Sequence, residues 1–242
     1  MNATVPQLIQ NLEHTASDVE MKQTMDALVQ KGSESVPDLL SAVGNLPQRK
    51  GLRRTVTQIF QRIGYPSNTA AIPFLVGIAS DINSPGWENA LTALKEAGEP
   101  ILPQVHEAIQ FYSKDYDQYG LYFQGLCTLL EEMGSPIIDS LLPDLLQLLE
   151  VGTSDNFIDE YALWPLSKIG SPKADAAVSI LKQKIQAKDQ GEVRPAFILA
   201  LQYFDLASVK QLAPVLYECL SNPSIPVQES ARKILSLIED LE

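Results

Sequence analysis

The sequence is poor in the residues on which most catalytic and metal sites depend. Among 242 residues there are two histidines and two cysteines. Histidine is the side chain best suited to proton transfer near neutral pH, and histidine and cysteine are typical zinc ligands. His14 and His106 stand apart from each other, and Cys127 and Cys219 belong to no CxxC or Cys/His cluster. We therefore expect no catalytic residues, no metal, no cofactor and no enzymatic activity.

Several motifs of nucleotide-binding proteins and hydrolases are also missing. The chain contains no GxxxxGK phosphate loop, no GxGxxG fingerprint and no GxSxG nucleophile turn. It has no apolar run approaching the ~20 residues of a membrane span. The first ten residues lack the charged start and apolar stretch of a secretory signal. Both cysteines lie among apolar residues, which suits a reducing compartment, so we expect a cytoplasmic protein that does not enter a membrane.

Positive charge is scarce. Lysine and arginine total 18 against 30 aspartates and glutamates, which gives a net charge of −12. Nucleic-acid binding needs cationic side chains that displace counterions from phosphate, so nucleic acid is disfavoured as a partner. An acidic surface attracts basic partners instead. We expect the partner to be another protein or peptide with basic character.

What the sequence does contain is a repeat with a period near 35 residues. Apolar helical segments end at glycines that are spaced by 32, 34, 36 and 36 residues. These glycines are Gly32, Gly64, Gly98, Gly134 and Gly170. Glycine just after a helix adopts the left-handed conformation without a Cβ clash. One further step reaches Asp205, which we expect to replace glycine in that conformation, although less well.

The residues before each junction follow one template. Positions 12, 8, 4 and 1 before the junction are apolar in 23 of 24 cases over six copies, the exception being Gly86. Such spacing places the four side chains on one face of an α-helix. We expect the two central positions to be buried. They hold Val56, Ala90, Leu126, Ala162, Phe197 and Ala231, and then Phe60, Leu94, Leu130, Leu166, Leu201 and Leu235.

This pattern predicts an all-α fold, a right-handed α-solenoid of about seven antiparallel helix pairs in a single array over residues 1–242. The first pair, residues 1–36, is expected to cap the array, because Glu20 and Thr24 occupy template positions that are apolar elsewhere. Residues 205–242 form the last pair. The helices are expected at 4–14, 18–31, 37–44, 51–63, 72–80, 85–97, 101–113, 118–133, 138–150, 155–169, 173–187, 192–204, 208–220 and 225–239. A longer connection is expected near residues 112–122.

Two copies carry a valine followed by arginine or glutamine and then the alanine and leucine positions of the template. They are Val193-Arg194 with Leu201, and Val227-Gln228 with Ala231 and Leu235. Arg53 occupies the same arginine position in an earlier copy. In these residues the chain, from about Asp18 to Leu241, resembles the HEAT-repeat family. The resemblance implies the fold and says little about function, because such arrays serve many unrelated roles.

The second helix of each pair usually lines the concave face of such an array, and one copy places aromatic residues there. Phe157, Tyr161 and Trp164 are spaced by four and three residues, beside the core stripe. Asp155, Asp159 and Glu160 lie in the same segment. Aromatic side chains among acids suit a basic protein surface, because aromatic anchors dominate many interfaces. Burial of the rings between repeats is the other interpretation. Trp87, Tyr116 and Tyr119 are candidates to extend this patch.

The leading functional prediction is therefore a non-catalytic scaffold or adaptor that binds a partner on its concave face. A first alternative is a subunit similar to the HEAT-like lyases that attach bilin pigments, with a prosthetic group in the groove. A second alternative is nucleic-acid binding through a basic cluster, as in HEAT-like DNA glycosylases. That cluster consists of Arg49, Lys50, Arg53, Arg54 and Arg62.

Overall fold

In the computed structural model every regular element is helical within the residues that it describes, which are 3–14, 17–44, 50–153, 155–187 and 193–240. No strand occurs in these ranges, so the prediction of an all-α chain is confirmed. None of the helices in the described ranges has the length and apolar character needed to cross a membrane. The chain divides into two compact units, residues 1–111 and 112–242, and each is described by itself.

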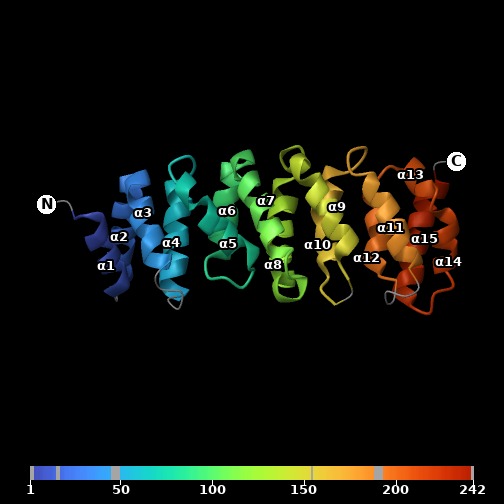
Figure 1. Cartoon of the computed structure of the whole chain (residues 1–242), viewed down its shortest axis with the longest axis horizontal. Coiled ribbons are helices and arrows are strands. Elements are labelled where there is room, and N and C mark those ends of the chain that lie inside the picture. Colours follow the sequence, from blue (N-terminus) through green and yellow to red (C-terminus); the bar gives the residue numbers. More distant parts are fainter. Residues whose placement is uncertain (1–2, 15–16, 45–49, 154, 188–192, 241–242) are drawn as a thin grey trace. The chain divides into compact units, whose positions relative to one another are not determined.

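The first unit consists of paired helices joined by short turns. In chain order these are α1 (Val5–His14), α2 (Asp18–Lys31), α3 (Val36–Gly44), α4 (Lys50–Ile63), α5 (Ile72–Ser80), α6 (Trp87–Ala97) and α7 (Leu102–Tyr112). Helix α2 packs against α1 and α4, and α6 packs against α4 and α5. The helices α2, α4 and α6 therefore follow one another side by side, each in contact with the next (Figure 1).

The second unit repeats this arrangement. Its helices are α8 (Tyr116–Met133), α9 (Leu142–Val151), α10 (Ile158–Ile169), α11 (Ala176–Gln186), α12 (Pro195–Ala200), α13 (Leu206–Lys210), α14 (Ala213–Cys219) and α15 (Ile225–Glu239). Helix α10 packs against α8, α9 and α12, and α12 packs against α11 and α15. Contacts between α9 and α11 and between α11 and α14 form the other layer. The repeat in the sequence is thus a repeat in the packing within each unit.

The template positions are buried as predicted. All twelve residues in the two central positions are at most 5% exposed, and ten of them have no exposed surface. The helices that carry these side chains pack against the helices of the neighbouring repeats. Burial of an aliphatic side chain stabilises a fold by roughly 1.5–3 kcal/mol, so these positions contribute strongly to the core.

The five junction glycines have φ between 55° and 71°, as predicted for residues that follow a helix with positive φ. Their ψ differs from that of the left-handed helical region: it is −130° at Gly32, −140° at Gly98, 175° at Gly134 and −170° at Gly170, a conformation that is essentially restricted to glycine. In four of them the glycine N–H donates to the carbonyl four residues earlier, as in Gly98 to Leu94 at 3.0 Å. The prediction for Asp205 was wrong. Asp205 has φ −57° and ψ 122°, and its side chain accepts from the Ser208 N–H at the start of α13. Because α12 ends in a 3-10 turn, Leu201–Tyr203, no left-handed residue is needed there.

Two predicted segments differ from the structure. The helix expected at 208–220 is divided into α13 and α14, since Pro214 has no N–H to donate to the preceding turn. The long connection expected near 112–122 was also wrong. Asp115 accepts a hydrogen bond from the Gln118 N–H at 3.0 Å, so α8 begins at Tyr116 and only residues 113–115 separate it from α7.

Candidate protein-binding surface

Two of the three aromatic residues predicted to form a patch, Tyr161 and Trp164, contact each other on α10. The rings of Tyr161 and Trp164 are half-buried and meet edge to face, with centroids 5.5 Å apart. Phe157 directly precedes the helix and is 45% exposed. Ile158 and Ala162, on the opposite face, are fully buried. The aromatic residues therefore form a stripe of their own, separate from the core, while their role in binding stays a prediction.

Phe157 has an unusual backbone. Its φ is 56° and its ψ is 13°, the one positive φ at a non-glycine residue in the described part of the chain. A bulky L-residue in this region costs on the order of 1–3 kcal/mol and persists only where its surroundings impose it. The sequence contains no sign of this conformation, because a glycine or asparagine would be the usual occupant.

The loop before α10 imposes the conformation through local hydrogen bonds. The N–H of Phe157 donates to the Thr153 carbonyl at 3.0 Å. The side-chain oxygen of Asn156 accepts from the N–H groups of Thr153 at 3.0 Å and Ile158 at 3.3 Å. Phe157 is therefore exposed on a tightly bonded turn.

Asp159 does not have the role that the sequence suggested. The prediction gave it exposed charge for attracting a partner, but the residue is 0% exposed. Its Oδ2 accepts from Lys184 Nζ at 2.9 Å and from the guanidinium of Arg194. A buried carboxylate is tolerated only with such pairing. Of the three predicted acids, Asp155 is exposed, whereas Glu160 is partly exposed and paired with Arg194.

Lys184 and Arg194 complete a buried charge cluster with Asp159 and Glu160. The Nη1 atom of Arg194 lies 3.0 Å from Glu160 Oε1, and Lys184 Nζ also donates to the Gly152 carbonyl at 2.8 Å. A Cβ built on Gly152 would lie 2.2 Å from the Asp159 nitrogen, so the loop backbone presses directly against the start of α10. The cluster thus joins α10, α11, the loop and the residue before α12.

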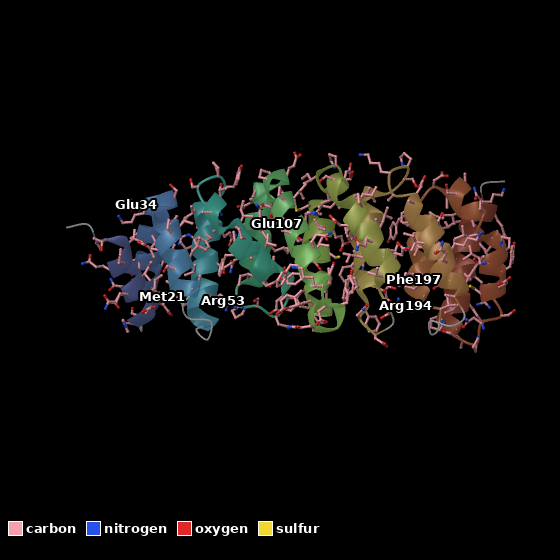
Figure 2. The ribbon with its side chains drawn as sticks, viewed as in Figure 1. Met21, Glu34, Arg53, Glu107, Arg194 and Phe197 are labelled. Atoms are coloured by element: carbon pink, nitrogen blue, oxygen red, sulfur yellow. The ribbon has the colours of Figure 1, made fainter. Side chains whose placement is uncertain are left out.

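Arg194 also links the cluster to the aromatic surface. Its guanidinium lies 4.3 Å from the ring centroid of Phe197, beside it in Figure 2, and 5.8 Å from that of Phe157. A cation this close to a ring face is attracted by the ring quadrupole. Sequence reasoning marked Arg194 as the arginine of a HEAT-like copy and missed Lys184. The sequence did offer one indication of this contact, because Asp159 and Arg194 are 35 residues apart and therefore hold the same position in successive repeats.

Burial changes the acid–base properties of two nearby groups. Burial raises the pKa of Tyr161 above its ordinary value of 10, and the charge of Glu160 adds to the effect. The hydroxyl of Tyr161 is therefore protonated and able to donate at neutral pH. Burial, together with Glu131, raises the pKa of the Cys127 thiol, so this cysteine has no nucleophilic thiolate. Within the described ranges, no three His, Cys, Asp or Glu side chains are grouped to hold a metal ion.

Trp87 belongs to the first unit, whereas the aromatic residues of α10 belong to the second. Its indole N–H donates to the Ala79 carbonyl at 2.9 Å, which fixes the ring beside α5. Together with Arg54 and the loop before α6 it lines a cavity of about 310 Å³. The structure therefore groups Trp87 with an arginine of the basic cluster, whereas the sequence analysis grouped it with the aromatic residues.

The basic cluster on α4 is divided among different contacts. Arg62 forms an ion pair with Asp26 of α2, with N and O 2.5 Å apart. Arg54 is exposed at the cavity beside Trp87, and Arg53, which Figure 2 labels on α4, is half-buried. Arg49 lies outside the described residues, as does the side chain of Lys50. Since Arg62 is already paired with an acid, this cluster offers less positive charge to phosphate than its sequence suggests.

No known family model matches this chain, and no curated protein is significantly similar to it. The resemblance to HEAT repeats therefore stays a prediction from the sequence.

Proposed function

We propose that the chain is a HEAT-like α-solenoid that acts as a non-catalytic scaffold in the cytoplasm and binds a basic partner protein. In this proposal about seven antiparallel helix pairs form one right-handed array, with the first and last pairs as caps. The period near 35 residues, the buried template positions and the side-by-side order of α2, α4, α6 and of α8, α10, α12 support this arrangement.

The exposed ring of Phe157 carries the functional proposal. A strained backbone at an exposed aromatic residue contributes nothing to the core, yet a loop and a buried charge cluster hold it in place. Strained residues concentrate at binding and catalytic sites. Aromatic anchors on rigid elements bind well, because little side-chain entropy is lost when they are buried. Phe157, with Tyr161 and Trp164 beside it, is the docking surface in this proposal.

The basic character of the partner follows from charge. Residues 112–242 contain 19 aspartates and glutamates against 10 lysines and arginines, a net charge of −9. Asp155 is exposed next to Phe157, and Glu160 is partly exposed. Acidic groups around an aromatic anchor increase the rate at which a basic partner associates, and salt weakens this effect.

The test is capture of a partner from extract of cells that make the protein, with three forms of the chain as bait. The forms are wild type, Phe157→Ser, and Tyr203→Ser as a control, since Tyr203 is 53% exposed in the same unit. We expect Phe157→Ser to lose a captured protein that wild type and Tyr203→Ser retain. If Phe157→Ser captures the same proteins in the same amounts, Phe157 is not the anchor and the proposal is wrong.

A further inference from the structure

Lys184 of α11 belongs to the repeat that follows the loop before α10, yet it contacts both ends of that loop. Its Nζ donates to the Gly152 carbonyl at 2.8 Å and to Asp159 Oδ2 at 2.9 Å. Gly152 directly follows α9, and Asp159 lies in the first turn of α10. The Lys184 side chain is 8% exposed. One buried ammonium group therefore joins the point where the chain leaves α9 to the point where it enters α10.

The two ends of the loop need a hydrogen-bond donor between them. Gly152 is buried, Asp159 is 0% exposed, and a Cβ built on Gly152 would lie 2.2 Å from the Asp159 nitrogen. This close approach removes a carbonyl oxygen and a carboxylate from water, and both groups can only accept hydrogen bonds. Buried acceptors without a donor destabilise a fold. The ammonium group of Lys184 therefore permits the two ends to come together.

The joined ends restrict Phe157, which lies two residues before Asp159. Between the ends, the Phe157 N–H donates to the Thr153 carbonyl at 3.0 Å. The chain reverses direction over this short segment, and Phe157 has its φ of 56° directly before the first residue of α10. A phenylalanine whose neighbours are free to move relaxes to a negative φ. Lys184 therefore helps to impose the strained conformation by holding the ends of the loop together.

The charge cluster and the strained phenylalanine occur in the same repeat. Asp159 and Arg194 hold the position eleven residues before the junction in successive copies of the template. Over six copies this position contains Arg53, Trp87, Phe123, Asp159, Arg194 and Gln228, so an acid is followed by a base in one place alone. That place also has the one positive φ at a non-glycine residue in the described part of the chain. The coincidence indicates that the cluster serves the loop and is not a general feature of the repeat.

The two cations of the cluster make different contacts. Arg194 pairs with Asp159 and Glu160, which are both in the first turn of α10, and its guanidinium lies 5.8 Å from the Phe157 ring centroid. Lys184 is the cation that reaches across to Gly152. Removal of the Lys184 charge therefore frees the start of the loop and still leaves Asp159 paired with Arg194.

Resting on the proposed function, we propose that Lys184 is a positioning residue of the docking surface. By joining Gly152 to Asp159, it holds Phe157 in its exposed conformation of positive φ. The anchor in one repeat is thus completed by a side chain of the next repeat.

Residue-resolved hydrogen exchange of the native protein tests the local effect. Lys184→Met removes the ammonium group and keeps the length of the side chain, and Lys182→Met is the control, since Lys182 is an exposed lysine of the same helix. We expect Lys184→Met to speed exchange of the Phe157 and Ile158 amides by about 10-fold relative to core amides such as Leu130, the factor for loss of a hydrogen bond to a charged group. Lys182→Met should leave these rates unchanged.

Equal acceleration at the loop and in the core would overturn the proposal, because Lys184 would then stabilise the whole unit without positioning the loop. Unchanged exchange at the loop would overturn it as well. If Lys184→Met does not fold, Lys184→Gln, which is neutral and has a shorter reach, repeats the comparison.

A double-mutant cycle tests whether Lys184 holds the strain at Phe157. In wild type, Lys184→Met loses two hydrogen bonds but releases strain, so the two effects offset each other in part. In the Phe157→Gly background there is no strain to release. Lys184→Met should therefore lower the Tm by more in that background than in wild type. Additive shifts in Tm would show that Lys184 does not impose the conformation of Phe157, and the proposal would be wrong.

Capture from cell extract separates this inference from the proposed function. With Lys184→Met as bait, we expect loss of the protein whose capture depends on Phe157, whereas Lys182→Met should retain it. If capture depends on Phe157 but not on Lys184, the positioning role is wrong and the proposed function stands. If capture does not depend on Phe157, the proposed function fails, while the exchange rates and the double-mutant cycle still decide whether Lys184 positions the loop.

Discussion

The two units of the chain share one core template and differ in what they place outside it. Residues 1–111 contain five aromatic residues and a net charge of −3, from 11 acidic and 8 basic side chains. Residues 112–242 contain twelve aromatic residues and a net charge of −9. Val56 and Ala90 of the first unit are as deeply buried as Leu126 and Ala162 of the second. The two units therefore share their buried template positions and differ in aromatic content and net charge.

The ion pairs of the two units differ in the same way. In the first unit, Arg62 and Asp26 connect α4 to α2 at the surface, with side chains 38% and 40% exposed. In the second unit, Asp159 is fully buried, with Lys184 8% and Arg194 16% exposed. Exposed pairs contribute about 0–1 kcal/mol, whereas removal of one partner from a buried pair costs about 3–5 kcal/mol. Only the second unit should therefore depend on its ion pairs for stability.

The largest expected loss of stability is that of Asp159→Ala, which removes the buried carboxylate of the second unit. The change leaves Lys184 and Arg194 buried without a carboxylate between them and should lower the free energy of unfolding by about 3–5 kcal/mol. Urea denaturation followed by circular dichroism measures it. Asp26→Ala is the matched change in the first unit and should cost less than about 1 kcal/mol. Equal losses from the two variants would contradict the distinction between the units.

The shared core predicts equal effects where the units are alike. Leu166→Ala in α10 and Leu94→Ala in α6 remove fully buried side chains from the same template position. Each should cost about 2–5 kcal/mol, from lost burial and the cavity left behind. Denaturant unfolding of both variants provides the comparison. A loss under about 1 kcal/mol in either one would show that the template register is wrong in that repeat.

Substitution of two glycines by alanine should change the free energy of unfolding by smaller amounts and in opposite directions. Gly152→Ala places a Cβ against the Asp159 backbone and should destabilise the second unit by about 1–3 kcal/mol. Gly77 lies exposed within α5 with no atom within 4 Å of its ideal Cβ. Gly77→Ala should stabilise the chain by about 0.5–1 kcal/mol, because alanine is the better helix former. Thermal unfolding of the two variants should therefore shift in opposite directions, and a common sign would refute this account of the loop before α10.

Much of the fold was predictable because it depends on local patterns. The positive φ of glycines such as Gly98 and the burial of residues such as Leu130 follow from a period that can be counted in the sequence. The start of α8 was misplaced because it depends on a side-chain cap from Asp115. The division of α13 from α14 was missed although Pro214 indicated it.

The candidate site was only partly predictable. The stripe of Phe157, Tyr161 and Trp164 followed from helical spacing, but the burial of Asp159 did not. An acid in the first turn of a helix is usually exposed, and Asp159 is buried because Lys184, 25 residues later, folds back onto it. The backbone of Phe157 is also set by its surroundings, since nothing in a phenylalanine favours a positive φ.

The most direct test of the central claim, that Phe157 is held in a strained conformation for binding, is Phe157→Gly. Glycine adopts a φ of 56° without strain, so thermal unfolding should show a stability equal to or above that of wild type. The same variant lacks the ring and should lose the partner that wild type captures. Normal or increased stability together with lost capture is the result that we predict. A clear loss of stability with capture retained would show that the ring is structural and that the docking site lies elsewhere.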